Sequence, residues 1–178
     1  MIDSEKNDFK YVCIYPGVFC PPTYGHLEIV KKACALFPHL YIMCSVNPDK
    51  KKSLFTQEEC VELWKFYDLP INCTVTTYDR YHKSGEALIG KFEKIIVRGL
   101  RVPNEIPEET NVIANANKAH QIIHFHYILS DCDKQGISSS AARLAAENYD
   151  VYALDQLVCR NIASRLIYEY VKQKNKMG

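Results

Sequence analysis

The strongest constraint on the fold is a regular alternation between short apolar runs and segments with helical periodicity. Five runs, each bounded by polar or turn-forming residues, predict strands buried in a sheet, over 10–15, 39–46, 71–78, 94–97 and 121–129. Apolar residues three and four positions apart predict helices over 25–37, from Thr56, over 83–92, 108–121, 138–148 and 155–173. Such alternation predicts an α/β fold, namely a single Rossmann-like, doubly wound domain with a five-stranded parallel sheet and helices on both faces.

Two local patterns predict where helices begin. Thr56 followed by Glu59 is a capping box, because each side chain can bond the backbone N–H of the other residue. Asp155 is the predicted N-cap of the last helix.

The length of 178 residues suits one domain, which we place at residues 10–174 after a polar tail over residues 1–9.

Charge and hydropathy restrict the partners of the chain. With 22 Lys and Arg against 21 Asp and Glu, the formal net charge is +1, so no global electrostatic attraction to nucleic acid is expected. No apolar run reaches the roughly 18 residues of a membrane span, and the polar start lacks the features of a signal peptide. We expect a cytoplasmic protein without a membrane or nucleic-acid partner.

Cysteines and histidines raise the question of metal binding. The eight cysteines include no CxxC pair, which favours reduced thiols. His124 and His126 share a strand face near His120 and Cys132, but no recognisable ligand spacing is complete, so no protein-bound metal is predicted. Cys20 is either a neutral filler in its loop or a reactive thiol, and the filler is favoured.

Groups that bind anions follow four of the predicted strands. His26 lies at a helix N-terminus after the first strand, and Lys50–Lys52 follow the second. Arg98 and Arg101 follow the fourth strand, and Ser138–Ser140 begin a helix after the fifth. Each group alone could be a helix cap or a solvated charge. Because parallel strands bring their carboxyl ends to one edge, the four together predict a site for several phosphates.

Two of these loops carry motifs of a known superfamily. Residues 23–26 read TYGH and resemble the T/H-x-G-H motif of nucleotidyltransferases, and residues 137–143 read ISSSAAR and resemble the I-S-S-[ST]-x-x-R motif. The stretches YPGVFCPPTYGHLEIV, NPDKK and VRGLR further resemble phosphopantetheine adenylyltransferases, over about residues 11–170. The resemblance implies adenylyl transfer from ATP to 4′-phosphopantetheine, which yields dephospho-coenzyme A and pyrophosphate.

The resemblance also implies roles for individual residues. The catalytic residues would be His26, Lys50 and Arg101. ATP would be bound by Phe19, His26, Gly99, Leu100, Arg101, Glu109, Ser138, Ser139 and Ser140. The acceptor would be bound by Val18, Lys50, Ser84 and Arg98, with Lys51 as an alternative to Lys50. The family further implies Mg²⁺ held mainly by ATP, and a homo-oligomer, by resemblance a hexamer.

Two departures from the family pattern leave other functions open. Val18 stands where the family has a threonine, and Glu105–Glu109 with Pro107 replaces a D-F-E-Y-E segment. One alternative is an adenylyltransferase of the same superfamily that acts on a pyridine mononucleotide, against which the VRGLR stretch argues. The other is a non-catalytic nucleotide-binding protein, against which the retained His26 and the basic residues argue.

Overall fold

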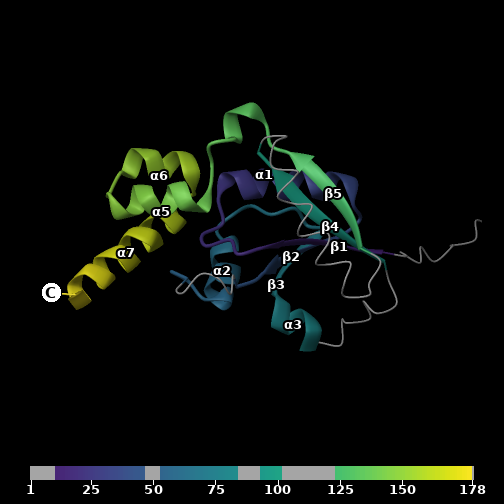
Figure 1. Ribbon diagram of the computed structural model, residues 1–178, viewed down its shortest axis with the longest axis horizontal. Coiled ribbons are helices and arrows are strands. Elements are labelled where there is room, and N and C mark those ends of the chain that lie inside the picture. Colours follow the sequence, from purple (N-terminus) through teal and green to yellow (C-terminus); the bar gives the residue numbers. More distant parts are fainter. Residues whose placement is uncertain (1–10, 47–52, 84–92, 102–122, 178) are drawn as a thin grey trace, which may run out of the picture.

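The computed structural model describes residues 11–46, 53–83, 93–101 and 123–177. The strands are β1 Tyr11–Gly17, β2 Leu40–Cys44, β3 Cys73–Thr77, β4 Glu93–Leu100 and β5 Ile123–Leu129. The helices are α1 Tyr24–Leu36, α2 Gln57–Trp64, α3 Tyr78–Lys83, the 3-10 turn η3 Cys132–Lys134, α5 Ser139–Glu147, α6 Val151–Leu157 and α7 Arg160–Met177. All strand pairs are parallel and the order is β3-β2-β1-β4-β5 (Figure 1), which confirms the predicted five-stranded parallel sheet.

Helices cover both faces of this sheet, as predicted. Side chains of a strand alternate between the faces, so neighbouring residues of β1 enter different apolar clusters. Tyr15 packs in the larger cluster with Ile29 of α1 and Trp64 of α2. Ile14 packs on the other face with Tyr81 of α3. The helices α5, α6 and α7 gather beside the sheet (Figure 1), and the larger cluster also includes residues of all three.

Side chains fix the ends of α1 and α2. The predicted capping box of α2 is confirmed, because Glu59 donates its N–H to Thr56 Oγ1 at 3.1 Å and Thr56 donates its N–H to Glu59 Oε2 at 2.9 Å. At the far end of α1, the Asn72 amide donates to the carbonyls of Cys34 and Phe37 at 2.9 and 3.1 Å. The capping box fixes the start of α2, and the Asn72 bonds anchor the end of α1 to the segment before β3.

The prediction of one last helix over 155–173 with Asp155 as its N-cap is wrong. Asp150 is the N-cap and accepts the Ala153 N–H at 3.0 Å, which places Asp155 inside α6. The backbone of Val158 is extended, and the side chain is fully buried in the larger cluster. Burial of this side chain therefore coincides with the break between α6 and α7, and α7 continues to Met177.

Other boundaries differ less from the prediction. The fourth strand is longer than predicted and includes Arg98 and Gly99, and α2 ends at Trp64. The polar tail over 1–9, the predicted helix over 108–121 and most of the predicted helix over 83–92 lie outside the described residues. In the part of the chain that is described, no helix is long and apolar enough to cross a membrane.

Candidate functional site

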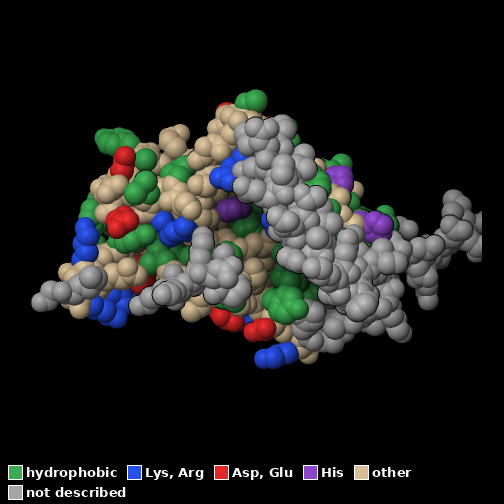
Figure 2. Space-filling view, viewed as in Figure 1, with side chains coloured by type: hydrophobic (Ala, Val, Ile, Leu, Met, Phe, Trp, Pro, Cys, Tyr) green, Lys and Arg blue, Asp and Glu red, His purple; other side chains and the backbone are tan. Residues whose placement is uncertain are grey.

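A cavity of about 330 Å³ opens at the carboxyl ends of β1 and β4, beside the N-termini of α1 and α5. This is the edge where an open parallel sheet is expected to hold its site, between β1 and β4, where the strand order reverses. Figure 2 shows a recess near the middle of one face, in which a histidine side chain lies beside basic side chains. The cavity is lined by Tyr15, Pro16, Gly17, Val18, Phe19, Gly25, His26, Ile29, Arg98, Gly99, Arg101, Ser130, Ile137 and Ser138.

The segment over 17–23 that joins β1 to α1, here the first loop, is shaped by the aromatic ring of Phe19. Phe19 has a φ of 46°, a left-handed conformation that costs an L-residue roughly 1–2 kcal/mol. Its ring is held edge-on by Tyr15, His26 and Trp64, at centroid distances of 5.2, 5.1 and 5.3 Å. A Cβ on Gly17 would lie 2.6 Å from this ring, so the loop requires glycine there. The packed ring thus holds an unfavourable backbone conformation beside the cavity.

His26 enters the cavity from the first turn of α1 in a defined tautomer. The backbone N–H of Thr23 donates to His26 Nδ1 at 3.1 Å, and Thr23 Oγ1 lies 3.0 Å from the same nitrogen. A backbone N–H can only donate, so Nδ1 is the acceptor and the neutral ring carries its proton on Nε2. Burial, and secondly the charge of Arg101, lower the pKa of His26 to about 4. His26 is therefore a neutral hydrogen-bond donor near pH 7.

Two arginines and a glycine lie at the end of β4. Arg98 and Arg101 both line the cavity, Arg98 near the Tyr15 hydroxyl and Arg101 near His26, as their electrostatic effects on these groups indicate. A Cβ on Gly99 would lie 2.8 Å from Ile29 Cγ1, so glycine allows α1 to approach the strand. The guanidinium groups of Arg98 and Arg101 therefore lie on the side of the cavity where α1 packs against β4.

The N-terminus of α5 is attached to the first loop by side chains. Ser138 lines the cavity as the N-cap, and its Oγ accepts the Ala141 N–H at 3.1 Å. Ser139 Oγ donates to the Pro21 carbonyl at 2.7 Å, and Arg143 donates to the Cys20 carbonyl. These bonds connect segments that are about 120 residues apart in the sequence and hold both at the cavity.

The structure brings seven of the predicted site residues to this cavity: Val18, Phe19, His26, Arg98, Gly99, Arg101 and Ser138. Leu100, Ser139 and Ser140 do not line it, because Leu100 is buried and the two serines are the first residues of α5, after its N-cap Ser138. Lys50, Ser84 and Glu109 lie outside the described residues. Tyr15, Ile29 and Ser130 also line the cavity without having been predicted, because no feature of the sequence distinguishes them from ordinary core or turn residues. Ile137 lines it as the first residue of the motif at 137–143.

Cys20 lies behind the cavity wall rather than in it. The thiol is 5% exposed and accepts a hydrogen bond from Ser53 Oγ at 3.1 Å. The hydrogen bond to Cys60 lowers its pKa to about 6, against the opposing effect of burial. All eight cysteines are free thiols, and the described residues contain no group of three or more metal-ligating side chains.

Comparisons with known proteins agree with this geometry. Residues 14–145 match the family model described as cytidylyltransferase-like, so the chain is a member of that family. Phosphopantetheine adenylyltransferase of Clostridium novyi is 32% identical over 74% of this chain and 81% of its own length. The same enzyme of Petrotoga mobilis is 35% identical over 77% of this chain and 84% of its own length. Within its family, the chain therefore belongs to the phosphopantetheine adenylyltransferases.

A solved structure supports the fold independently. Nicotinic acid mononucleotide adenylyltransferase of Plasmodium falciparum, complexed with APC, superimposes with a TM-score of 0.56 over 90% of this chain and 96% of that chain. The sequence identity is 13%, so this similarity shows the Rossmann-like fold and nothing about the substrate.

Proposed function

We propose that the protein transfers the adenylyl group of ATP to 4′-phosphopantetheine and releases pyrophosphate. The observation that carries the proposal is the placement of His26, Arg98 and Arg101 in one cavity beside the N-terminus of α5. Membership of the phosphopantetheine adenylyltransferases supports this acceptor over a pyridine mononucleotide. The same cavity could bind a nucleotide without catalysis, but the Nε2–H of the neutral His26, for which no acceptor is found among the described residues, favours a donor to the reacting phosphate.

The reaction needs positioning and charge stabilisation rather than a covalent intermediate. An oxygen of the acceptor phosphate attacks the α-phosphorus of ATP, a new P–O bond forms, and the bond to pyrophosphate breaks. The acceptor is already an anion, so no strong general base is required. His26 Nε2–H donates to an α-phosphate oxygen and Arg101 neutralises charge beside it, while the α5 N-terminus holds the leaving phosphates.

Mg²⁺ belongs to this proposal as a companion of ATP. The described lining residues include no carboxylate, so the chain offers no all-protein cage for the ion. Mg²⁺ commonly keeps several waters and binds substrate phosphates directly, so the ion would be held by ATP, whose phosphates the arginines of the cavity attract. When bound, the ion supplies further neutralisation of the phosphate charge. A homo-oligomer and a cytoplasmic location remain predictions from the resemblance and the composition.

Pyrophosphate release tests the function directly. The purified protein is incubated with ATP and Mg²⁺ and, in separate reactions, with 4′-phosphopantetheine, nicotinate mononucleotide or nicotinamide mononucleotide. We expect release with phosphopantetheine alone. Release only with a mononucleotide would assign the other acceptor, and ATP binding without release from any acceptor would favour the non-catalytic protein.

Val18 gives a second test, because it lines the cavity where the family has threonine. Val18→Thr adds a hydroxyl that can donate to the acceptor phosphate, so the KM for phosphopantetheine is expected to fall by up to about tenfold. Steady-state kinetics with varied acceptor measure the effect. Val171→Thr, an exposed position on α7, serves as the matched control. An unchanged KM after Val18→Thr would mean that another group already binds that phosphate oxygen.

A further inference from the structure

Ser130 is a polar residue of the cavity to which neither the motifs nor the proposed mechanism assigns a role. It follows β5 directly, lines the cavity and is only 7% exposed. No hydrogen bond of its hydroxyl to the described residues is found, although its backbone N–H is engaged by the Leu100 carbonyl. The residue is mostly buried but lines the cavity, so a molecule bound there can replace water as the partner of its hydroxyl.

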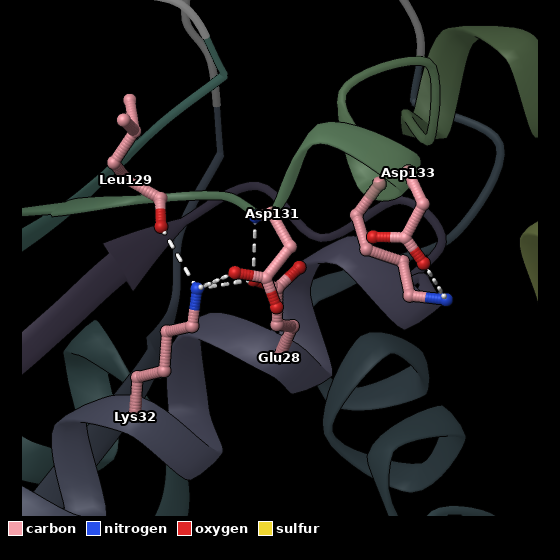
Figure 3. A network of polar contacts seen from close by, with 6 residues as sticks. Glu28, Lys32, Leu129, Asp131 and Asp133 are labelled. Atoms are coloured by element: carbon pink, nitrogen blue, oxygen red, sulfur yellow. Dashed lines mark hydrogen bonds and ion pairs between the residues drawn. The ribbon is translucent and has the colours of Figure 1, made fainter.

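The backbone on both sides of Ser130 is held firmly. Ser130 donates its N–H to the Leu100 carbonyl at 2.8 Å, which extends the pairing of β5 with β4. Lys32 Nζ donates to the Leu129 carbonyl at 2.9 Å and to Asp131 Oδ1 at 2.8 Å (Figure 3). These bonds fix the backbone that carries the Ser130 side chain at the cavity wall.

Glu28 completes the support from α1. Its Oε1 accepts the N–H of Asp131 at 2.9 Å and pairs with Lys32 Nζ at 2.6 Å (Figure 3). Lys32 and Glu28 lie on the helix that carries His26 at its N-terminus. The segment around Ser130 is therefore fixed to the same helix that presents the proposed catalytic histidine.

The position of Ser130 identifies the part of a nucleotide that it can reach. In β5, Ile128 is paired with Gly99 and lies in the apolar cluster beneath α1. Two residues further, Ser130 continues along that face, where Gly99 lies against Ile29. The lining residues Ile29, Gly99 and Ser130 are uncharged, which suits a nucleoside, whereas the cations Arg98 and Arg101 and the N-terminus of α5 suit phosphates.

We propose that the Ser130 hydroxyl forms a hydrogen bond with the nucleoside part of the nucleotide substrate, at a ribose hydroxyl or a base edge. The inference rests on the proposed function, in which ATP occupies this cavity. Ser130 is then a binding residue that orients the nucleoside, and Lys32 and Glu28 are positioning residues that act through it.

Binding measurements without an acceptor test this contact. Isothermal titration with ATP and Mg²⁺ is expected to give a Kd about threefold to tenfold higher for Ser130→Ala than for the wild type, as for one lost neutral hydrogen bond. The Kd for inorganic tripolyphosphate, which has no nucleoside, is expected to stay unchanged. Ser164→Ala on the exposed face of α7 is the matched control.

A second variant separates the lost hydrogen bond from lost packing. Ser130→Cys keeps the volume but supplies only a weak donor, so it should bind ATP as weakly as Ser130→Ala, with a Tm close to that of the wild type. Wild-type affinity in both variants, or an equal loss of affinity for tripolyphosphate, would overturn the assignment. Failure of the wild type itself to bind ATP would instead refute the proposed function, so the two failures are distinguishable.

Discussion

His26→Ala is expected to lower kcat roughly 10²–10³-fold, the range known for loss of one donor to a developing negative charge. The donor is Nε2–H, because Nδ1 is engaged by the Thr23 backbone. The Kd for ATP should change little, since both arginines and the α5 N-terminus remain. Pyrophosphate release measures kcat and isothermal titration measures the Kd. His39→Ala, at the opposite end of the sheet, is the matched control.

The protonation of His26 adds a pH test to this prediction. A folded-state pKa of about 4 keeps the ring neutral from about pH 5 upward, so kcat/KM should show no titration of His26 near its ordinary value of 6.5.

In the unfolded chain the ring takes up a proton as the pH falls through about 6.5, while the folded chain resists this down to about 4. The wild type should therefore lose stability relative to His26→Ala over that interval. Near-normal kcat in His26→Ala would contradict the assigned role.

Arg98→Ala is expected to raise the KM for phosphopantetheine about tenfold to a hundredfold, and to raise it more than the KM for ATP. A guanidinium forms charge-assisted bonds with phosphate worth roughly 1.5–3 kcal/mol, which corresponds to that range. The charge of Arg98 acts on Tyr15 and that of Arg101 acts on His26, which supports separate phosphate partners. Steady-state kinetics with each substrate varied in turn measure both KM values.

The control for Arg98→Ala is Arg160→Ala, which removes an exposed arginine at the start of α7. It should leave both KM values unchanged. A larger increase in the KM for ATP than for the acceptor after Arg98→Ala would mean that the two arginines have exchanged roles.

Much of the fold could be predicted because its pattern is local. Continuous apolar runs mark strands that are buried on both faces, and the pairing of Thr56 with Glu59 marks the start of α2. The end of the chain was not predictable in the same way, since Asp150 and Asp155 are equally good N-caps in sequence. Burial of Val158 against distant elements accompanies the break, and a local pattern does not contain that contact.

The site was predictable where motifs fix both residue type and position, as for His26 and Arg98. Ser130 was missed because a serine after a strand has the appearance of an ordinary turn residue. Its burial depends on the register of β5 with β4 and on contacts from α1, which only the folded chain reveals. Ser139 illustrates the converse, since a motif serine uses its hydroxyl to hold the Pro21 carbonyl.

The attachment of α5 to the first loop has a thermodynamic consequence. Ser139 and Arg143 bind carbonyls of this loop directly, so bonds within the chain join the two halves of the cavity. The substrate does not have to bring these segments together, and its binding energy is not consumed in ordering them. The two segments are also energetically coupled through these bonds. Substitutions in one should alter the effect of substitutions in the other, so the motifs at 23–26 and 137–143 are expected to tolerate change jointly rather than separately.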